Sequence, residues 1–98
     1  MLIVGGDFHL DPDQREAFLA SRLDAMEHSR SEAGCLEYAF AADPVDPGRV
    51  ILFERWESQE ALDAHLKAMR SRPQPATPAP APRSASIKLY DVSAERSL

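Results

Sequence analysis

The chain has 98 residues, enough for one hydrophobic core, so we expect a single domain over residues 1–98. Sixteen acidic against eleven basic residues give a net charge of −5, and no basic face stands out, which argues against a nucleic-acid partner. No stretch approaches the roughly 18 apolar residues of a membrane span. The opening MLIVGG lacks the basic flank of a signal peptide, so no membrane contact and a cytoplasmic location are expected.

Metal-ligating residue types are sparse and scattered. The single cysteine, Cys35, cannot form an intramolecular disulfide, and it has no evident neighbouring base that would make it a nucleophile. His9, His28 and His65 lack the mutual spacing and the cysteine neighbours of a zinc site. The sequence therefore predicts no metal framework, and Cys35 is expected to be a small buried hydrophobe.

Residues 2–8, LIVGGDF, predict a first strand. The adjacent Gly5 and Gly6 would weaken a strand, which indicates a bulge or the close approach of another group. Asp7 is the only charge and lies on the same side as Ile3 and Gly5. If that side faces the helices, Asp7 is a polar group in a cavity; if not, Asp7 is a strand-end residue in water.

Asp11 and Pro12 predict the start of a helix that ends near Arg30. A second strand over 35–41 follows, and turn residues at 43–48 then predict an antiparallel hairpin with a third strand. Tyr38 lies on an apolar face of the second strand and is expected in the core; a contact between its hydroxyl and a ligand remains open.

Residues 50–65, VILFERWESQEALDAH, predict a buried strand followed by a helix. The run 50–53 is apolar on both faces, as in a strand covered on both sides, and Glu54 and Trp56 after it share one face. In the helix, His65 lies within the apolar stripe. This imidazole is either a core histidine paired with a carboxylate or carbonyl, or a group that borders a pocket.

Five of the eight prolines fall within residues 73–83, which predicts an extended Pro/Ala-rich spacer before a last strand at 86–92. The resulting order, strand–helix–strand–strand–helix–strand, predicts an α+β fold of the ferredoxin-like split βαβ (βαββαβ) type with a four-stranded antiparallel sheet. Right-handed crossovers place both helices on one face of that sheet and leave the other face bare. A second copy packed sheet against sheet is the simplest cover, so we expect a homodimer.

Three stretches resemble the antibiotic biosynthesis monooxygenase family: EAGCLEY at 32–38, VILFERW at 50–56, and SQEAL at 58–62 followed by His65. The resemblance covers residues 1 to about 70. It implies a dimeric α+β barrel of two ferredoxin-like subunits, each with a cavity between helices and sheet. It also implies, for the oxygenases of the family, oxidation of quinols or polycyclic phenols by dioxygen without metal or flavin.

The residues that match the family motifs by position are Glu32, Gly34, Cys35, Tyr38, Glu54, Trp56 and His65. Asp7 stands where several members carry a substrate-contacting asparagine. Haem-degrading members have a tryptophan in place of His65, and their iron-ligating histidine would fall within 69–75, where this chain has none. Haem, and any other cofactor, is therefore not expected.

The resemblance implies a cofactor-independent monooxygenase that acts on a small aromatic phenol or quinol with dioxygen. His65 is the expected base, oriented by Glu54, because imidazole exchanges protons near neutral pH. The expected catalytic residues are His65, Glu54 and Asp7, and the expected substrate-binding residues are Trp56, Tyr38 and Phe53. Two alternatives remain open: a non-catalytic small-molecule-binding or stress-related dimeric barrel, with a filled core beside His65, and an oxygen-independent isomerase on the same scaffold.

Overall fold

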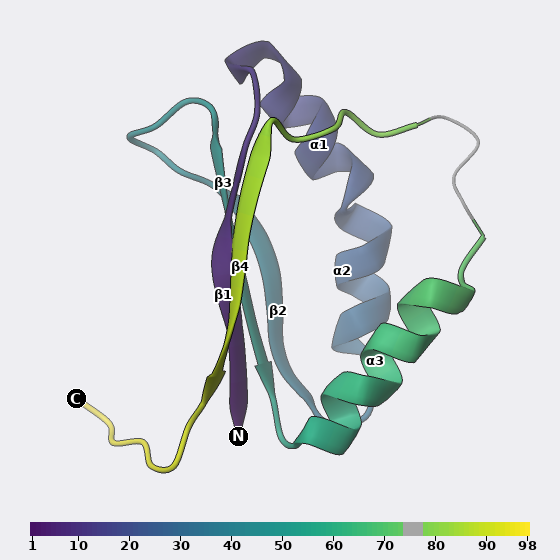
Figure 1. Ribbon diagram of the computed structural model, residues 1–98, viewed down its shortest axis with the longest axis vertical. Helices are drawn as coiled ribbons and strands as arrows, with labels where there is room; N and C mark the ends of the chain where they lie inside the picture. Colours follow the sequence, from purple (N-terminus) through teal and green to yellow (C-terminus); the bar gives the residue numbers. More distant parts are fainter. Residues whose placement is uncertain (74–77) are drawn as a thin grey trace.

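The computed structural model of the chain describes residues 1–73 and 78–98. Its elements, in chain order, are β1 (Leu2–His9), η1 (Pro12–Gln14), α1 (Arg15–Ser21), α2 (Leu23–Arg30), β2 (Cys35–Ala42), β3 (Arg49–Trp56), α3 (Gln59–Ser71) and β4 (Ser84–Asp91). The strands form one layer and the helices a second layer on one side of it (Figure 1). The predicted ferredoxin-like α+β fold is confirmed.

The sheet has the strand order β2-β3-β1-β4, and each neighbouring pair is antiparallel. β1 pairs without interruption on both sides, so its two glycines mark no bulge. A Cβ on Gly6 would collide with the carbonyl oxygen of Ser86 in β4. Of the two explanations offered for the paired glycines, close approach of another backbone is the one that holds at Gly6.

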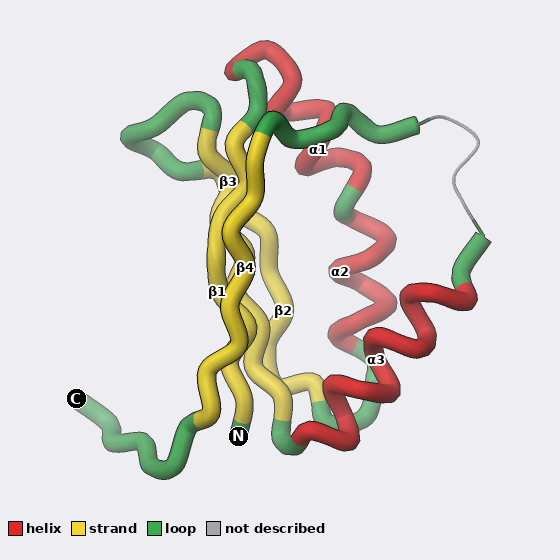
Figure 2. Tube along the Cα trace, in the orientation of Figure 1, coloured by secondary structure: helices red, strands yellow, loops and turns green. Residues whose placement is uncertain are grey.

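Residues of β3 alternate strictly between the two faces of the sheet. Val50, Leu52, Glu54 and Trp56 are buried beneath the helices, while the residues between them are half-buried on the opposite face. All helices in the described ranges lie on the same side of the sheet (Figure 2). The core therefore lies between helices and sheet, and no described helix covers the other face, as the sequence predicts.

The sequence predicts one helix as far as Arg30, and this is wrong: the helix is divided at Arg22 into α1 and α2. The Ser21 hydroxyl donates to the Phe18 carbonyl, and the Arg22 N–H donates to the Leu19 carbonyl at 3.0 Å. Serine back-bonding bends helices, and a bond to the third residue back tightens the turn. Arg22 consequently lies at a bend that faces the sheet.

The predicted spacer at 73–83 joins α3 to β4, and its residues 74–77 lie outside the described part. At its far end the Arg83 N–H donates to the His9 carbonyl at 2.7 Å, and β4 then pairs with β1 of its own chain. No helix within 1–73 or 78–98 has the length and apolar content needed to cross a bilayer.

Candidate functional site

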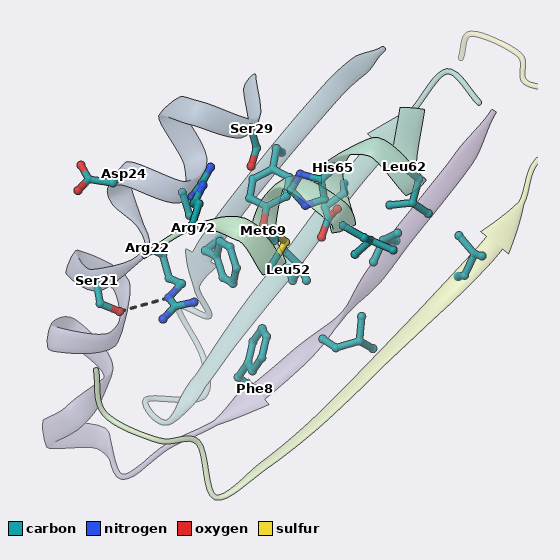
Figure 3. A pocket seen from close by; sticks show the side chains of 18 of the residues that line it. Phe8, Ser21, Arg22, Asp24, Ser29, Leu52, Leu62, His65, Met69 and Arg72 are labelled. Atoms are coloured by element: carbon teal, nitrogen blue, oxygen red, sulfur yellow. Dashed lines mark hydrogen bonds between the residues drawn. The ribbon is translucent and has the colours of Figure 1, made fainter. Parts of the chain in front are cut away.

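A cavity of about 830 Å³ lies between the helices and the sheet. Apolar side chains make up much of its wall, among them Phe8 from β1, Leu52 from β3 and Leu62 from α3 (Figure 3). Cavities of this volume accommodate small organic ligands. The space beside His65 is therefore hollow, in contrast to the filled core that the non-catalytic alternative predicts.

His65 is fixed at the wall of this cavity by one carboxylate. Its side chain projects from α3, the residue is 1% exposed, and Nδ1 lies 2.7 Å from Oε1 of Glu32. Glu32 follows the end of α2, and the helical spacing of the α3 stripe turns the imidazole inward to meet it. With Nδ1 bound to a carboxylate, Nε2 is the ring nitrogen left for a ligand.

Two aromatic rings hold the imidazole from the sheet side. The Trp56 ring centroid lies 4.6 Å from that of His65, and the Tyr38 ring centroid lies 5.3 Å from it. Trp56 is fully buried behind His65 and does not line the cavity, whereas Tyr38 does. Trp56 thus packs behind the His65 ring, and Tyr38 lies at the cavity wall.

Glu54 does not orient His65, contrary to the sequence-based expectation. Its Oε1 accepts a hydrogen bond from Nε1 of Trp56 at 2.9 Å, while Glu32 takes the place at Nδ1 of His65. Glu54 is 5% exposed, lines the cavity, and has its pKa raised by burial. Glu32 is part of the motif at 32–38, but no role was expected for it from the sequence. The signal that could have pointed to it was the presence of an acidic residue at the turn before Gly34.

Tyr38 and Ser29 contribute the hydroxyl-bearing side chains of the inner wall. Burial raises the pKa of Tyr38 to about 12, against the opposing positive charges of Arg22 and Arg72. The phenol is therefore neutral, and its O–H is a hydrogen-bond donor, over the whole physiological range. Ser29 is 1% exposed, and within the described residues its Oγ has no hydrogen-bond partner.

Asp7 and Phe53 lie on the opposite face of the sheet and do not line the cavity. Alternation explains this, since Val4 and Phe8 of β1 are the residues that face the helices. Asp7 Oδ2 accepts a hydrogen bond from Nε of Arg49 at 2.7 Å, and this bond lowers the pKa of Asp7. Neither residue is placed where it would touch a ligand beside His65.

Cys35 is half-buried against the core, and burial raises its pKa, which keeps the thiol protonated. Over the described ranges, no three histidine, cysteine, aspartate or glutamate side chains come together as metal ligands. The cavity-lining residues with polar side chains supply an imidazole, carboxylates, hydroxyls and two guanidinium groups, and Lys88 of β4 is a further cation among them. These can transfer a proton and orient an oxygen-bearing aromatic molecule.

Comparison with known proteins identifies the family that the sequence motifs resemble. The profile of the family described as "Antibiotic biosynthesis monooxygenase" matches residues 1–72. Rv0793 from Mycobacterium tuberculosis is 46% identical over 55 residues, which are 55% of this chain and 52% of Rv0793. Its structure superposes with a TM-score of 0.69 at 28% identity, covering 98% of each chain.

Two further relatives set limits on what similarity conveys. The uncharacterized protein sll1783 from Synechocystis is 36% identical over 66 residues, which are 67% of this chain but only 45% of that protein. The sequence match therefore spans less than two thirds of the length of these curated relatives. The haem degrader MhuD of Mycobacterium tuberculosis superposes with a TM-score of 0.73, covering 99% of this chain and 100% of that chain, and its 14% identity shows a shared fold alone.

Proposed function

Because this chain belongs to the antibiotic biosynthesis monooxygenase family, we propose that it oxidises a small aromatic phenol or quinol with dioxygen and without a cofactor. The observation that carries the proposal is the position of His65. The residue is 1% exposed, and its ring is held by Glu32 through Nδ1 and lies at the wall of a cavity of about 830 Å³. A histidine with a purely structural role needs no adjoining cavity of this size.

The proposed reaction begins with proton transfer from the substrate hydroxyl to Nε2 of His65. The resulting electron-rich anion gives an electron to dioxygen, and the phenoxyl and superoxide radicals combine to form a carbon–oxygen bond. The ring C–H bond at that carbon then loses its proton and the O–O bond breaks. One oxygen atom remains as the new quinone carbonyl and the other takes up two protons and leaves as water, so that a phenol and dioxygen yield a quinone and water. The anionic carboxylate of Glu32 stabilises the imidazolium formed in the first step.

Tyr38 is proposed as a donor to the substrate oxygen that becomes negative. Its phenol is protonated at neutral pH, because its pKa is about 12, and it lines the same cavity as His65. The apolar part of the wall lowers the local dielectric constant, which strengthens these hydrogen bonds. Glu54, with its Oε1 bound to Trp56, is proposed to line the substrate pocket rather than to act as the base.

We further propose that the protein is a homodimer whose interface is the face of the sheet opposite the helices. Half-buried Ile51 and Phe53 lie on this face, as does Tyr90, which is 51% exposed. The face also carries the Asp7–Arg49 pair, and exposed apolar side chains grouped among polar ones are typical of an interaction surface. A second copy related by a twofold axis would bury it symmetrically.

Oxygen uptake tests the proposed reaction. The protein is incubated with a panel of naphthols, anthrones and benzene or naphthalene quinols, and consumption above the uncatalysed rate is recorded with an oxygen electrode. His65→Ala should reduce the enzymatic rate at least about a hundredfold, the contribution typical of a general base. His28→Ala is the matched control, since His28 is exposed and does not line the cavity. Unchanged uptake by His65→Ala, or turnover of the same substrate without oxygen, would refute the proposal.

A further inference from the structure

Two arginines lie at the cavity without a carboxylate to neutralise them. Arg22, at the bend between α1 and α2, and Arg72, directly after α3, both line the cavity, and both are half-buried (Figure 3). Within the described residues, neither guanidinium lies within ion-pair distance of an acidic group. Residues 74–77 are QPAT and include no acidic side chain.

Arg22 is held in place by groups that leave its charge unpaired. Its guanidinium carbon lies 5.1 Å from the centroid of the Phe18 ring, and its Nε donates to Oγ of Ser21 at 3.2 Å. An aromatic face and a hydroxyl orient the guanidinium without removing its positive charge. The remaining N–H donors are thus available to an anion.

The acidic groups around the cavity do not cancel this charge. Glu32 is engaged by His65, and Glu54 accepts from Trp56 and has its pKa raised by burial. Asp24 also lines the cavity, but it is exposed, so water screens its charge. The result is a cavity with a base at one position and uncompensated positive charge at another.

We infer that the cavity selects organic anions: aromatic molecules that carry a carboxylate or sulfonate on the side away from the reacting hydroxyl, with Arg22 and Arg72 as the anion-binding residues. Arg72 follows His65 by seven residues, which corresponds to about 10 Å along a helix. A fused aromatic acid spans that distance. Leu66, Met69, Ile87 and Leu89, which are 40–48% exposed at the cavity, would contact its apolar body.

The inference rests on the proposed function in placing the substrate in this cavity, but it is testable by binding alone. The probe is 8-anilinonaphthalene-1-sulfonate, and N-phenyl-1-naphthylamine is its neutral counterpart without the sulfonate. Fluorescence titration of the full chain gives an affinity for each. The double variant Arg22→Gln/Arg72→Gln should bind the sulfonate about tenfold or more weakly, because charge-assisted hydrogen bonds are lost, and should bind the neutral probe within about twofold of the unmodified protein.

Arg70→Gln is the matched control, because it removes the same charge from the last turn of α3 at a residue that does not line the cavity. It should leave both affinities within about twofold. Equal losses for both probes, an unchanged sulfonate affinity in the double variant, or an equal loss in Arg70→Gln would overturn the inference. His65→Ala should retain sulfonate binding, so a failure of the proposed oxygenase chemistry would leave this result standing.

Discussion

Glu32 Oε1 lies 2.7 Å from Nδ1 of His65, and this contact joins the turn before β2 to the middle of α3. The carboxylate is 16% exposed and the imidazole is 2% exposed, measured on the side chains. A charge-assisted hydrogen bond in such a setting fixes the ring and determines which nitrogen carries the proton. Glu32 is therefore a positioning residue, and His65 is the group that would meet the substrate.

Glu32→Gln should lower kcat about tenfold to a hundredfold, the range typical of a group that supports a reacting histidine. The amide preserves the shape but cannot stabilise the imidazolium formed in the proposed reaction. Oxygen uptake by both proteins at pH 7, over a range of substrate concentrations, separates kcat from KM. A purely structural Glu32 would reduce the melting temperature and leave kcat unchanged, which would contradict the assignment.

The buried phenol of Tyr38 predicts how the stability of the fold changes at alkaline pH. Its pKa is about 12 in the folded protein against an ordinary value of 10.0, so the folded state retains a proton that the unfolded chain releases first. Stability should therefore fall as pH rises from 10 to 12, by about 2 kcal/mol from this group.

Urea unfolding at pH 9 and pH 11.5 measures that loss. Tyr38→Phe should show a smaller decrease between the two pH values than the unmodified protein, because it has no phenol to ionise in the core. Equal decreases in the two proteins would contradict the buried position of the Tyr38 hydroxyl.

Glu54 should make the fold less stable as the solution is brought to neutral pH. Burial raises the pKa of Glu54 above its ordinary value of 4.5, so the folded state holds a proton that the unfolded state has lost, and stability decreases as pH rises through that window. Glu54→Gln removes the charge while its Oε1 still accepts from Trp56. The melting temperature of Glu54→Gln minus that of the unmodified protein should therefore be larger at pH 7 than at pH 4. An equal difference at the two pH values would contradict this.

The sequence pattern was sufficient to predict the fold, because the local signals for strands, helices and turns agreed with one another. In β3 only every second residue is buried, so Ile51 and Phe53 are half-buried where the apolar run 50–53 predicted cover on both sides. His65, on the apolar stripe of α3, is buried as predicted. The Ser58 side chain accepts from the Ala61 N–H at 3.1 Å and so caps the start of α3. The break at Arg22 escaped prediction, because serine back-bonding competes with an otherwise continuous helical pattern.

The site was less predictable, because its contacts join distant parts of the chain. The nearest carboxylate in sequence to His65 on a buried face was Glu54, yet the partner is Glu32, which is 33 residues away. For Asp7 and Phe53, sequence alternation defined two faces but could not decide which one meets the helices. The packing of α1, α2 and α3 on one side of the sheet assigns those faces (Figure 2).

The open face of the sheet yields a prediction about assembly. Phe53→Glu would place a charge at the centre of the proposed interface, where burying it without a partner is unfavourable. The variant should elute as a monomer in size-exclusion chromatography with light scattering, while the unmodified protein elutes as a dimer. Leu23→Glu is the control, since Leu23 is 56% exposed on α2. A dimeric Phe53→Glu variant would place the interface elsewhere.

Gly34 controls the turn that carries Glu32 toward His65. Its φ of 82° lies in the left-handed region, and a Cβ there would lie 2.5 Å from Cβ of Ala61 in α3. Its carbonyl also accepts the Glu57 N–H at 2.9 Å, which ties the turn to the segment before α3. Any side chain at this position therefore disturbs both the backbone and the packing of the turn.

Gly34→Ala should lower the free energy of unfolding by about 2–4 kcal/mol, since about 1–2 kcal/mol comes from the left-handed conformation and the rest from the collision with Ala61. Urea unfolding measures the change. Ala61→Gly in the same chain removes the colliding methyl group and should recover only the steric part of the loss. The free energy of unfolding of the double variant should therefore lie between that of Gly34→Ala and that of the unmodified protein. Full recovery would mean that the backbone conformation is not strained, and no recovery would mean that Ala61 is not the obstacle.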